Sequence, residues 1–162
     1  MAVDMFLKIA EIPGESVDAD ANHKGTMDIL AWSWGMSQSG TTHSGPGGGA
    51  GKVNVQDISV TKYVDIASPL LMLYCSGGKH LKEALLTVRK AGDKPLEYMV
   101  IKMTDAIVTS VSTGGSGGED RLTENVSLNF AKVEYKYTSQ KTDGSAGDKK
   151  EYKWDIAGNA KL

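Results

Sequence analysis

Alternation of apolar and polar residues is clearest in the segment 122–137, which follows a glycine cluster. Every second residue near its start is apolar and the residues between are small and uncharged, namely Val126, Leu128 and Phe130 against Asn125, Ser127 and Asn129. A period of two predicts an antiparallel strand with one buried face and one polar face. The polar face carries no catalytic group, which is typical of a wall and not of a reaction site.

The segment 27–39 has the same period with two unequal faces. One face is large and apolar and the other is small, namely Leu30, Trp32, Trp34 and Met36 against Ala31, Ser33, Gly35, Ser37 and Ser39. This pattern predicts one long strand whose tryptophan face is buried in a core. Its small face would let another backbone approach or would border a water-filled space.

Further apolar patterns predict the remaining strands, over 3–10, 53–64, 82–90, 96–112 and around Tyr152, Trp154 and Ile156. In 53–64 the apolar positions change side, which indicates a bulge or a switch of buried face. One helix is predicted, with Ser68 as its N-cap, Pro69 at its first position and Gly77-Gly78 as its end. Residues 12–26 and 40–52 are predicted loops, and 139–150 a mobile stretch.

Many strands with one helix predict a mainly β fold. We expect a closed or nearly closed antiparallel β-barrel of two packed sheets, with one short flanking α-helix near 68–77. The length of 162 residues suits a single domain over 1–162.

Composition narrows the classes of function. The net charge is −2 and basic residues are scattered among acidic ones, so nucleic acid is not an expected partner. The one cysteine, Cys75, cannot form an internal disulfide and fits a reducing compartment. The first ten residues include Asp4 and Lys8 and do not resemble a cleaved signal peptide. The longest apolar run, within Pro69–Cys75, is too short for membrane insertion.

Motifs for catalysis, metals and cofactors are weak. Pro46 and Val53 break the phosphate-loop pattern around Gly51-Lys52. The spacing of the candidate metal ligands matches no zinc motif, so no metal and no cofactor are expected, the candidates being His23, His43, His80 and Cys75. No nucleophile elbow is present and Ser33 has no local base, so we expect no enzyme, although distant residues could converge on Ser33.

Three long segments resemble one known family. They read LAWSWGMSQSG at 30–40, GAGKVNVQDISVTKY at 49–63 and STGGSGGEDRLTENVSLNF at 112–130. They are similar to the haemolysin-coregulated proteins (Hcp) of bacterial type VI secretion, and the similarity covers nearly the whole chain. The resemblance implies a β-barrel subunit that forms homohexameric rings, which stack into the inner tube of a contractile machine. A sheath surrounds that tube, a valine-glycine-repeat spike caps it, and effector proteins travel in its lumen with the ring as chaperone. It also implies assembly in the cytoplasm and secretion without a cleaved leader.

Face alternation together with this resemblance assigns roles to residues. The lumen-lining candidates are Ala31, Ser33, Gly35, Ser37, Asn125, Ser127 and Asn129, with Ser33 as the favoured cargo contact. The ring-stacking candidates lie in the loop 40–52 and are Thr42, His43, Ser44, Gly47, Gly48, Gly49 and Lys52. Glu119, Asp120 and Arg121 fit either a solvated turn or a subunit contact. The alternative to a tube subunit is a monomeric barrel that binds a small ligand in a tryptophan-lined cavity.

Overall fold

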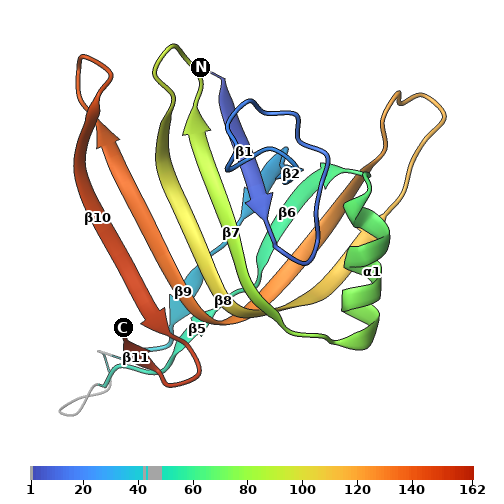
Figure 1. Cartoon of the computed structure of the whole chain (residues 1–162). Coiled ribbons are helices and arrows are strands. Elements are labelled where there is room, and N and C mark those ends of the chain that lie inside the picture. Colours follow the sequence, from blue (N-terminus) through green and yellow to red (C-terminus); the bar gives the residue numbers. More distant parts are fainter. Residues whose placement is uncertain (1, 42, 44–48) are drawn as a thin grey trace.

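The computed structural model describes residues 2–41, 43 and 49–162. In this part of the chain a nine-stranded antiparallel sheet curls into a nearly closed barrel, with one helix at its flank (Figure 1). The strands are β1 (Val3–Lys8), β2 (Met27–Asp28), β3 (Ala31–Ser33), β4 (Met36–Gln38), β5 (Val53–Val55), β6 (Ile58–Tyr63), β7 (Leu81–Lys90), β8 (Leu96–Thr113), β9 (Thr123–Gln140), β10 (Ala146–Asp155) and β11 (Ala160–Lys161), and the helix is α1 (Ala67–Gly77). β4 and β5 form a separate two-stranded sheet. The predicted fold class is confirmed.

The long strand β9 belongs to two parts of the barrel. Its first half pairs with β6 and its second half pairs with β10, while β8 pairs with it along most of its length. Residues 27–33 connect the edge of the sheet at β1 with the edge at β6, because β2 pairs with β1 and β3 pairs with β6. The amide of Leu30 donates to the carbonyl of Thr61 at 2.8 Å between these two pairings. The barrel is therefore closed by a crossing of the chain, without a continuous ladder.

The prediction of one strand over 27–39 is wrong. The segment is divided into β2, β3 and β4, since it leaves one sheet edge to join another. Leu30 and Met36, predicted to be buried, are each 41% exposed. Trp32 and Trp34 pack at the border of the core and are only partly buried. In 53–64, by contrast, the predicted change of buried face is confirmed as the break between β5 and β6.

Aliphatic side chains from both halves of the barrel fill its core. Those with the least exposure are Leu7, Met27, Ile58, Leu71, Leu86, Ile101, Met103 and Leu128. Helix α1 contributes Leu71 to this core and ends, as predicted, at a left-handed glycine, Gly78, with φ +61°. Among the described residues, no helix has both the length and the hydropathy needed to cross a bilayer.

The start of α1 differs from the prediction. Ser68 lies inside the helix and is not its N-cap, and Oδ1 of Asp65 accepts from the amide of Ala67 at 2.9 Å. The Ser68 hydroxyl is used elsewhere, because it donates to Oε1 of Glu124 on β9 at 2.6 Å. The same oxygen accepts from the ammonium of Lys62 at 2.6 Å, and the side chains of Lys62 and Glu124 are both fully buried. This ion pair fixes the helix start to β6 and β9.

The stretch 139–150 is mostly ordered, contrary to the prediction of a mobile segment. β9 continues to Gln140, β10 begins at Ala146, and the amide of Lys141 donates to the carbonyl of Ser145 at 2.8 Å. Gly144, with φ +89°, provides the left-handed residue that this short turn needs. The resulting hairpin of β9 and β10 forms the left edge of the sheet in Figure 1.

Candidate functional site

Small polar side chains from four adjacent strands form one continuous surface. The strands follow the order β3, β6, β9 and β8, and cross-strand pairing aligns the residues in two rows. The rows are Ser33, Ser59, Ser127 and Ser110, and beside them Ala31, Thr61, Asn125 and Ser112. We call these eight residues the hydroxyl face.

Strict alternation produces this surface. On β6 and β9 the residues between the polar positions are buried, with Val60 at 1% exposure and Val126 and Leu128 at 0%. The polar positions themselves are exposed or half-buried. Because residues paired across an antiparallel sheet share a face, burial of one side turns the small polar side chains outward together.

The polar groups of the hydroxyl face partly satisfy one another. The hydroxyl of Thr61 donates to Oδ1 of Asn125 at 2.7 Å. At its border both carboxylate oxygens of Asp57 accept hydrogen bonds at 2.8 Å, one from the hydroxyl of Thr109 and one from Nδ2 of Asn129. The eight residues carry no formal charge, and the bordering carboxylate is already engaged. The surface can therefore offer weak hydrogen bonds but holds no base that could activate a serine.

The structure brings together most of the predicted lumen-lining residues. Ala31, Ser33, Asn125 and Ser127 lie in the two rows, and Asn129 lies beside Asp57 at their border. Gly35 lies in the connection between β3 and β4, and Ser37 pairs with Asn54 in the separate two-stranded sheet. These two residues share a sequence pattern with Ser33 but not its sheet.

Half of the hydroxyl face was missed by the sequence analysis. Ser59 and Thr61 lie on β6, and Ser110 and Ser112 lie on β8. The signal was present, because β6 also alternates between apolar and small polar residues. What the sequence does not reveal is which strands are neighbours, and only the pairing of β3 with β6 and of β6 with β9 assembles the rows.

The predicted stacking loop is only partly described. His43, Gly49 and Lys52 are exposed, whereas Thr42, Ser44, Gly47 and Gly48 lie outside the described residues. Lys52 leads directly into strand β5 and not into a helix, so no helix N-terminus follows it to bind a phosphate.

Glu119, Asp120 and Arg121 lie in the connection between β8 and β9 and are all exposed. The guanidinium carbon of Arg121 lies 3.7 Å from the ring centroid of Tyr63. This contact orients Arg121 on the surface, and both interpretations of the turn remain predictions.

A second polar region lies on the opposite side of the sheet from the core, where loop 12–26 covers β1, β7 and β8. We call its strand residues, Asp4, Phe6, Thr87, Arg89 and Glu97, the covered face. Arg89 donates to both carboxylate oxygens of Asp18, at 3.1 and 2.6 Å, and to Asp4 at 3.0 Å. The hydrogen bond from Arg89 is the main reason why the pKa of Asp18 is lowered. These contacts fix the loop to the sheet.

Trp32 and Trp34 pack against other side chains of the barrel. The ring of Trp34 stacks on Tyr135 with 6.3 Å between centroids, and its Nε1 donates to the carbonyl of Gln56 at 2.9 Å. Trp32 also packs against the core cluster. Both side chains are therefore used in packing, although they are only partly buried.

Known proteins resemble the chain over nearly its whole length. A family model described as "Type VI secretion system effector, Hcp" matches residues 6–137. Protein hcp1 of Pseudomonas aeruginosa is 58% identical over 161 residues, which cover 98% of each chain. The crystal structure of Hcp1 from Salmonella typhimurium has a TM-score of 0.81 and 39% identity, with 100% of both chains covered. A structure of a type six secretion system protein has a TM-score of 0.90 and 31% identity, covering 99% of this chain and 100% of the other.

Proposed function

This chain belongs to the Hcp family of type VI secretion proteins, and on that premise we propose that it is the structural subunit of a secreted tube. Six copies form a ring, and rings stack into a tube that a contracting sheath expels. The family supports the secretion route, and the hydroxyl face is the observation in the structure that supports a conduit. The protein acts as building material and carrier, without turnover of a substrate.

We assign the hydroxyl face to the wall of the lumen. Its side chains are short, uncharged and partly hydrogen-bonded to one another, so a passing protein meets no strong charge and no large apolar patch. Rotation about a ring axis would repeat the same surface in every subunit. Cargo is then held by many weak contacts, which retain it in the tube and still allow release.

The other partners follow from the same assignment. Assembly takes place in the cytoplasm, the sheath encloses the outer surface of the tube, and the valine-glycine-repeat spike binds its tip. Effector proteins occupy the lumen and are protected there before secretion. Glu119, Asp120 and Arg121, exposed beside β6 and β9, are candidates for contact with the neighbouring subunit.

Electron microscopy of the purified protein tests the proposal directly. Negative-stain images, with size-exclusion chromatography, should show annular particles of uniform diameter with a central hole. A monomer without a hole under all conditions would contradict the tube and leave the small-ligand barrel as the alternative. That alternative gains no support from the barrel interior, which is filled by residues such as Ile58 and Leu128, both at 0% exposure.

The loop 40–52 is proposed to join one ring to the next. Its glycine content suits a segment that becomes ordered on contact, and the entropic cost of ordering keeps the joint weak. Deletion of residues 44–50 should leave hexamers intact and abolish long tubes and secretion. Electron microscopy and an assay of the culture supernatant measure both effects, and normal secretion by the deletion variant would exclude the stacking role.

A further inference from the structure

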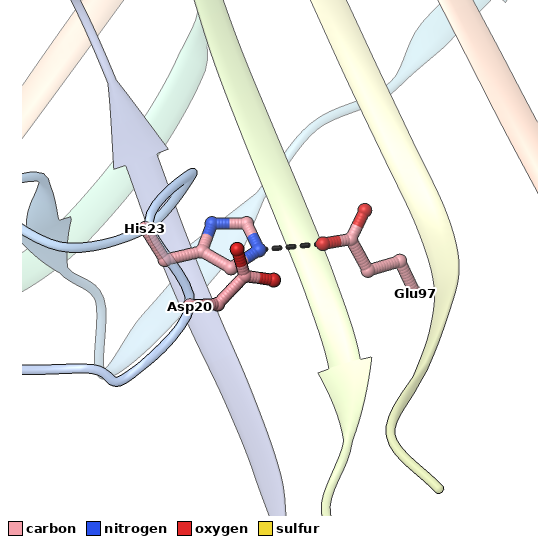
Figure 2. A group of neighbouring side chains, drawn as sticks. All are labelled: Asp20, His23 and Glu97. Carbon is pink, nitrogen blue, oxygen red and sulfur yellow. Dashed lines mark hydrogen bonds and ion pairs between the residues drawn. The ribbon is translucent and has the colours of Figure 1, made fainter.

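Three potential metal ligands converge where loop 12–26 meets the start of β8. Figure 2 shows the imidazole of His23 pointing to the carboxylate of Glu97, with Asp20 beside it. Nε2 of His23 lies 2.5 Å from Oε1 of Glu97, and the ligand atoms of the three residues all lie within 4.8 Å of one another. His23 and Glu97 are 74 residues apart, so the ligand spacing along the sequence gave no indication of this group.

The imidazole of His23 is held in a fixed orientation. Its side chain is 6% exposed and its ring stacks on Phe6 with 4.2 Å between centroids and 8° between planes. The amide of Lys24 donates to the carbonyl of Asp20 at 2.9 Å, and the hydroxyl of Thr26 donates to the carbonyl of His23 at 2.6 Å. This turn places two residues three apart on the same side, so a nitrogen and an oxygen ligand are organised before an ion arrives.

The charges around His23 favour a divalent cation. Asp20 and Glu97 place two carboxylates beside the imidazole of His23. Arg89, the cross-strand partner of Glu97, directs both terminal nitrogens to Asp18 and Asp4 and is thereby engaged elsewhere. Lys8 lies in the lining of the adjoining hollow and offsets part of the negative charge. Two carboxylates nevertheless match the charge of one divalent ion.

The ligand set fits a metal of the zinc class. Zinc binds imidazole nitrogen and carboxylate oxygen, and three protein ligands leave one position for water. A hollow of about 170 Å³, lined by His23, Glu97, Asn22 and Thr87 among others, adjoins the group and has room for that water. Magnesium and calcium would prefer an all-oxygen site, which the buried imidazole does not provide.

We propose that Asp20, His23 and Glu97 bind one divalent transition-metal ion of the zinc class. Ligands of a tetrahedral zinc ion lie roughly 3.3 Å apart, so Glu97 has to move away from His23 when the ion enters. The Glu97 side chain is 42% exposed and is free to make this movement. The ion replaces the hydrogen bond between His23 and Glu97 and joins loop 12–26 to β8. The site lies within one chain, so it does not depend on ring assembly.

Isothermal titration calorimetry with zinc chloride, near neutral pH and after treatment with a chelator, tests the site. The wild-type protein should bind one ion per chain. Glu97→Gln and Asp20→Asn should each reduce the zinc affinity by a factor of at least about ten, because loss of a group that only hydrogen-bonds to a metal ligand already costs about tenfold. Glutamine at 97 can still accept a hydrogen bond from His23 and keeps the length of the side chain. Cooperative melting without zinc verifies that each variant is folded.

His80→Asn is the matched control. Nδ1 of His80 lies 2.6 Å from Oδ1 of Asp105, but this exposed pair belongs to no group of three ligands among the described residues. Its removal should leave zinc binding unchanged. Absence of saturable binding to the wild type, equal binding by Glu97→Gln, or loss of binding in His80→Asn would each overturn the proposal.

Two further measurements separate a metal site from a simple hydrogen bond. Zinc should raise the melting temperature of the wild type more than that of Glu97→Gln, because the folded wild type binds the ion more tightly. The imidazole proton signals of His23 should shift in the NMR spectrum on addition of zinc, while those of His80 stay in place. Unchanged His23 signals at saturating zinc would show that the residue serves only as a hydrogen-bonding clamp.

Discussion

The hydroxyl face and the covered face are both polar sides of amphipathic strands, yet they are built from different side chains. The hydroxyl face consists of serine, threonine, asparagine and alanine, and its hydrogen bonds run between neighbouring strands. The covered face holds charged and aromatic residues, and its bonds run to loop 12–26. A polar strand face can thus be left open or be covered by another segment, and the chemistry of its side chains distinguishes the two.

The difference has a physical cause. Arg89 on the covered face is 8% exposed, so its charge requires the carboxylates of Asp18 and Asp4 as partners. Ser33, Asn125 and Ser112 on the hydroxyl face are exposed to water and require no such partners. A loop is therefore needed on one face, and an unobstructed surface is possible on the other.

The largest loss of stability is expected from substitution of Lys62, which lies on the buried side of β6 beneath the hydroxyl face. Lys62→Met removes the ammonium from a fully buried carboxylate, Glu124, whose other oxygen already has no partner among the described residues. Leaving a buried charge unpaired should lower the free energy of unfolding by about 3–5 kcal/mol. Urea denaturation at one fixed protein concentration measures the change. A Lys62→Met, Glu124→Leu double variant should recover much of it, and no recovery would contradict an unpaired charge as the cause.

Loss of the Arg89 guanidinium from the covered face should lower the stability less. Arg89→Met leaves Asp18 and Asp4 without a partner, but their side chains are 20% and 45% exposed and water can replace the guanidinium in part. We expect a loss of about 2–3 kcal/mol, together with faster hydrogen exchange in loop 12–26. Arg121→Met is the control, because Arg121 lies over the ring of Tyr63, as Arg89 lies over that of Phe6 at 5.0 Å, but Arg121 is exposed. Equal effects of the two substitutions would contradict the clamping role of Arg89.

Substitutions on the hydroxyl face should hardly change the stability of the fold but should impair its function. Ser33→Gln, at an exposed position, should change the free energy of unfolding by no more than about 0.5 kcal/mol. Its longer side chain should still weaken cargo retention, measured by mass spectrometry of the proteins that purify with the rings. Ser76→Gln on the exposed side of α1 is the control and should retain cargo. Normal rings that keep every effector in Ser33→Gln would refute the lumen assignment.

The smallest effect is expected on the hairpin of β9 and β10, which is charged and open. Burial alone would raise the pKa of Glu134, but its hydrogen bond to Lys153 and the charges of Lys102 and Lys153 lower it overall. A lowered pKa stabilises the fold above the pKa of the unfolded chain, and this contribution is lost as the pH falls toward the folded value. Glu134→Gln should cost at most about 0.5 kcal/mol at neutral pH. The difference from the wild type should shrink in acid, and a difference that grows would contradict the sign of the shift.

Sequence patterns were sufficient for most of the strands, for the presence of the helix and for the class of fold, because the strands and the helix follow local periodicity. They also identified Ala31, Ser33, Asn125 and Ser127, which the structure places in adjacent rows. They could not show that 27–39 is divided between two sheet edges, since alternation continues across the breaks. The alternation of residues along a strand does not determine which other strand pairs with it.

The remaining features depend on residues far apart in the chain. Lys62 and Glu124 follow the pattern of buried positions although both are charged, and only their pairing across 62 residues makes this possible. Loop 12–26 has no periodicity, so its contacts with Arg89 and Glu97 could not be derived from local patterns. The convergence of Asp20, His23 and Glu97 is of the same kind.

The continuity of β9 has a mechanical consequence. One 18-residue strand carries bonds to β6 in its first half and to β10 in its second, with β8 alongside for most of its length. Hydrogen bonds in an antiparallel sheet lie perpendicular to the strands. A pull along β9 consequently loads many bonds in shear at once and cannot unzip them singly, so a sudden thrust on either half is transmitted to the other through covalent backbone.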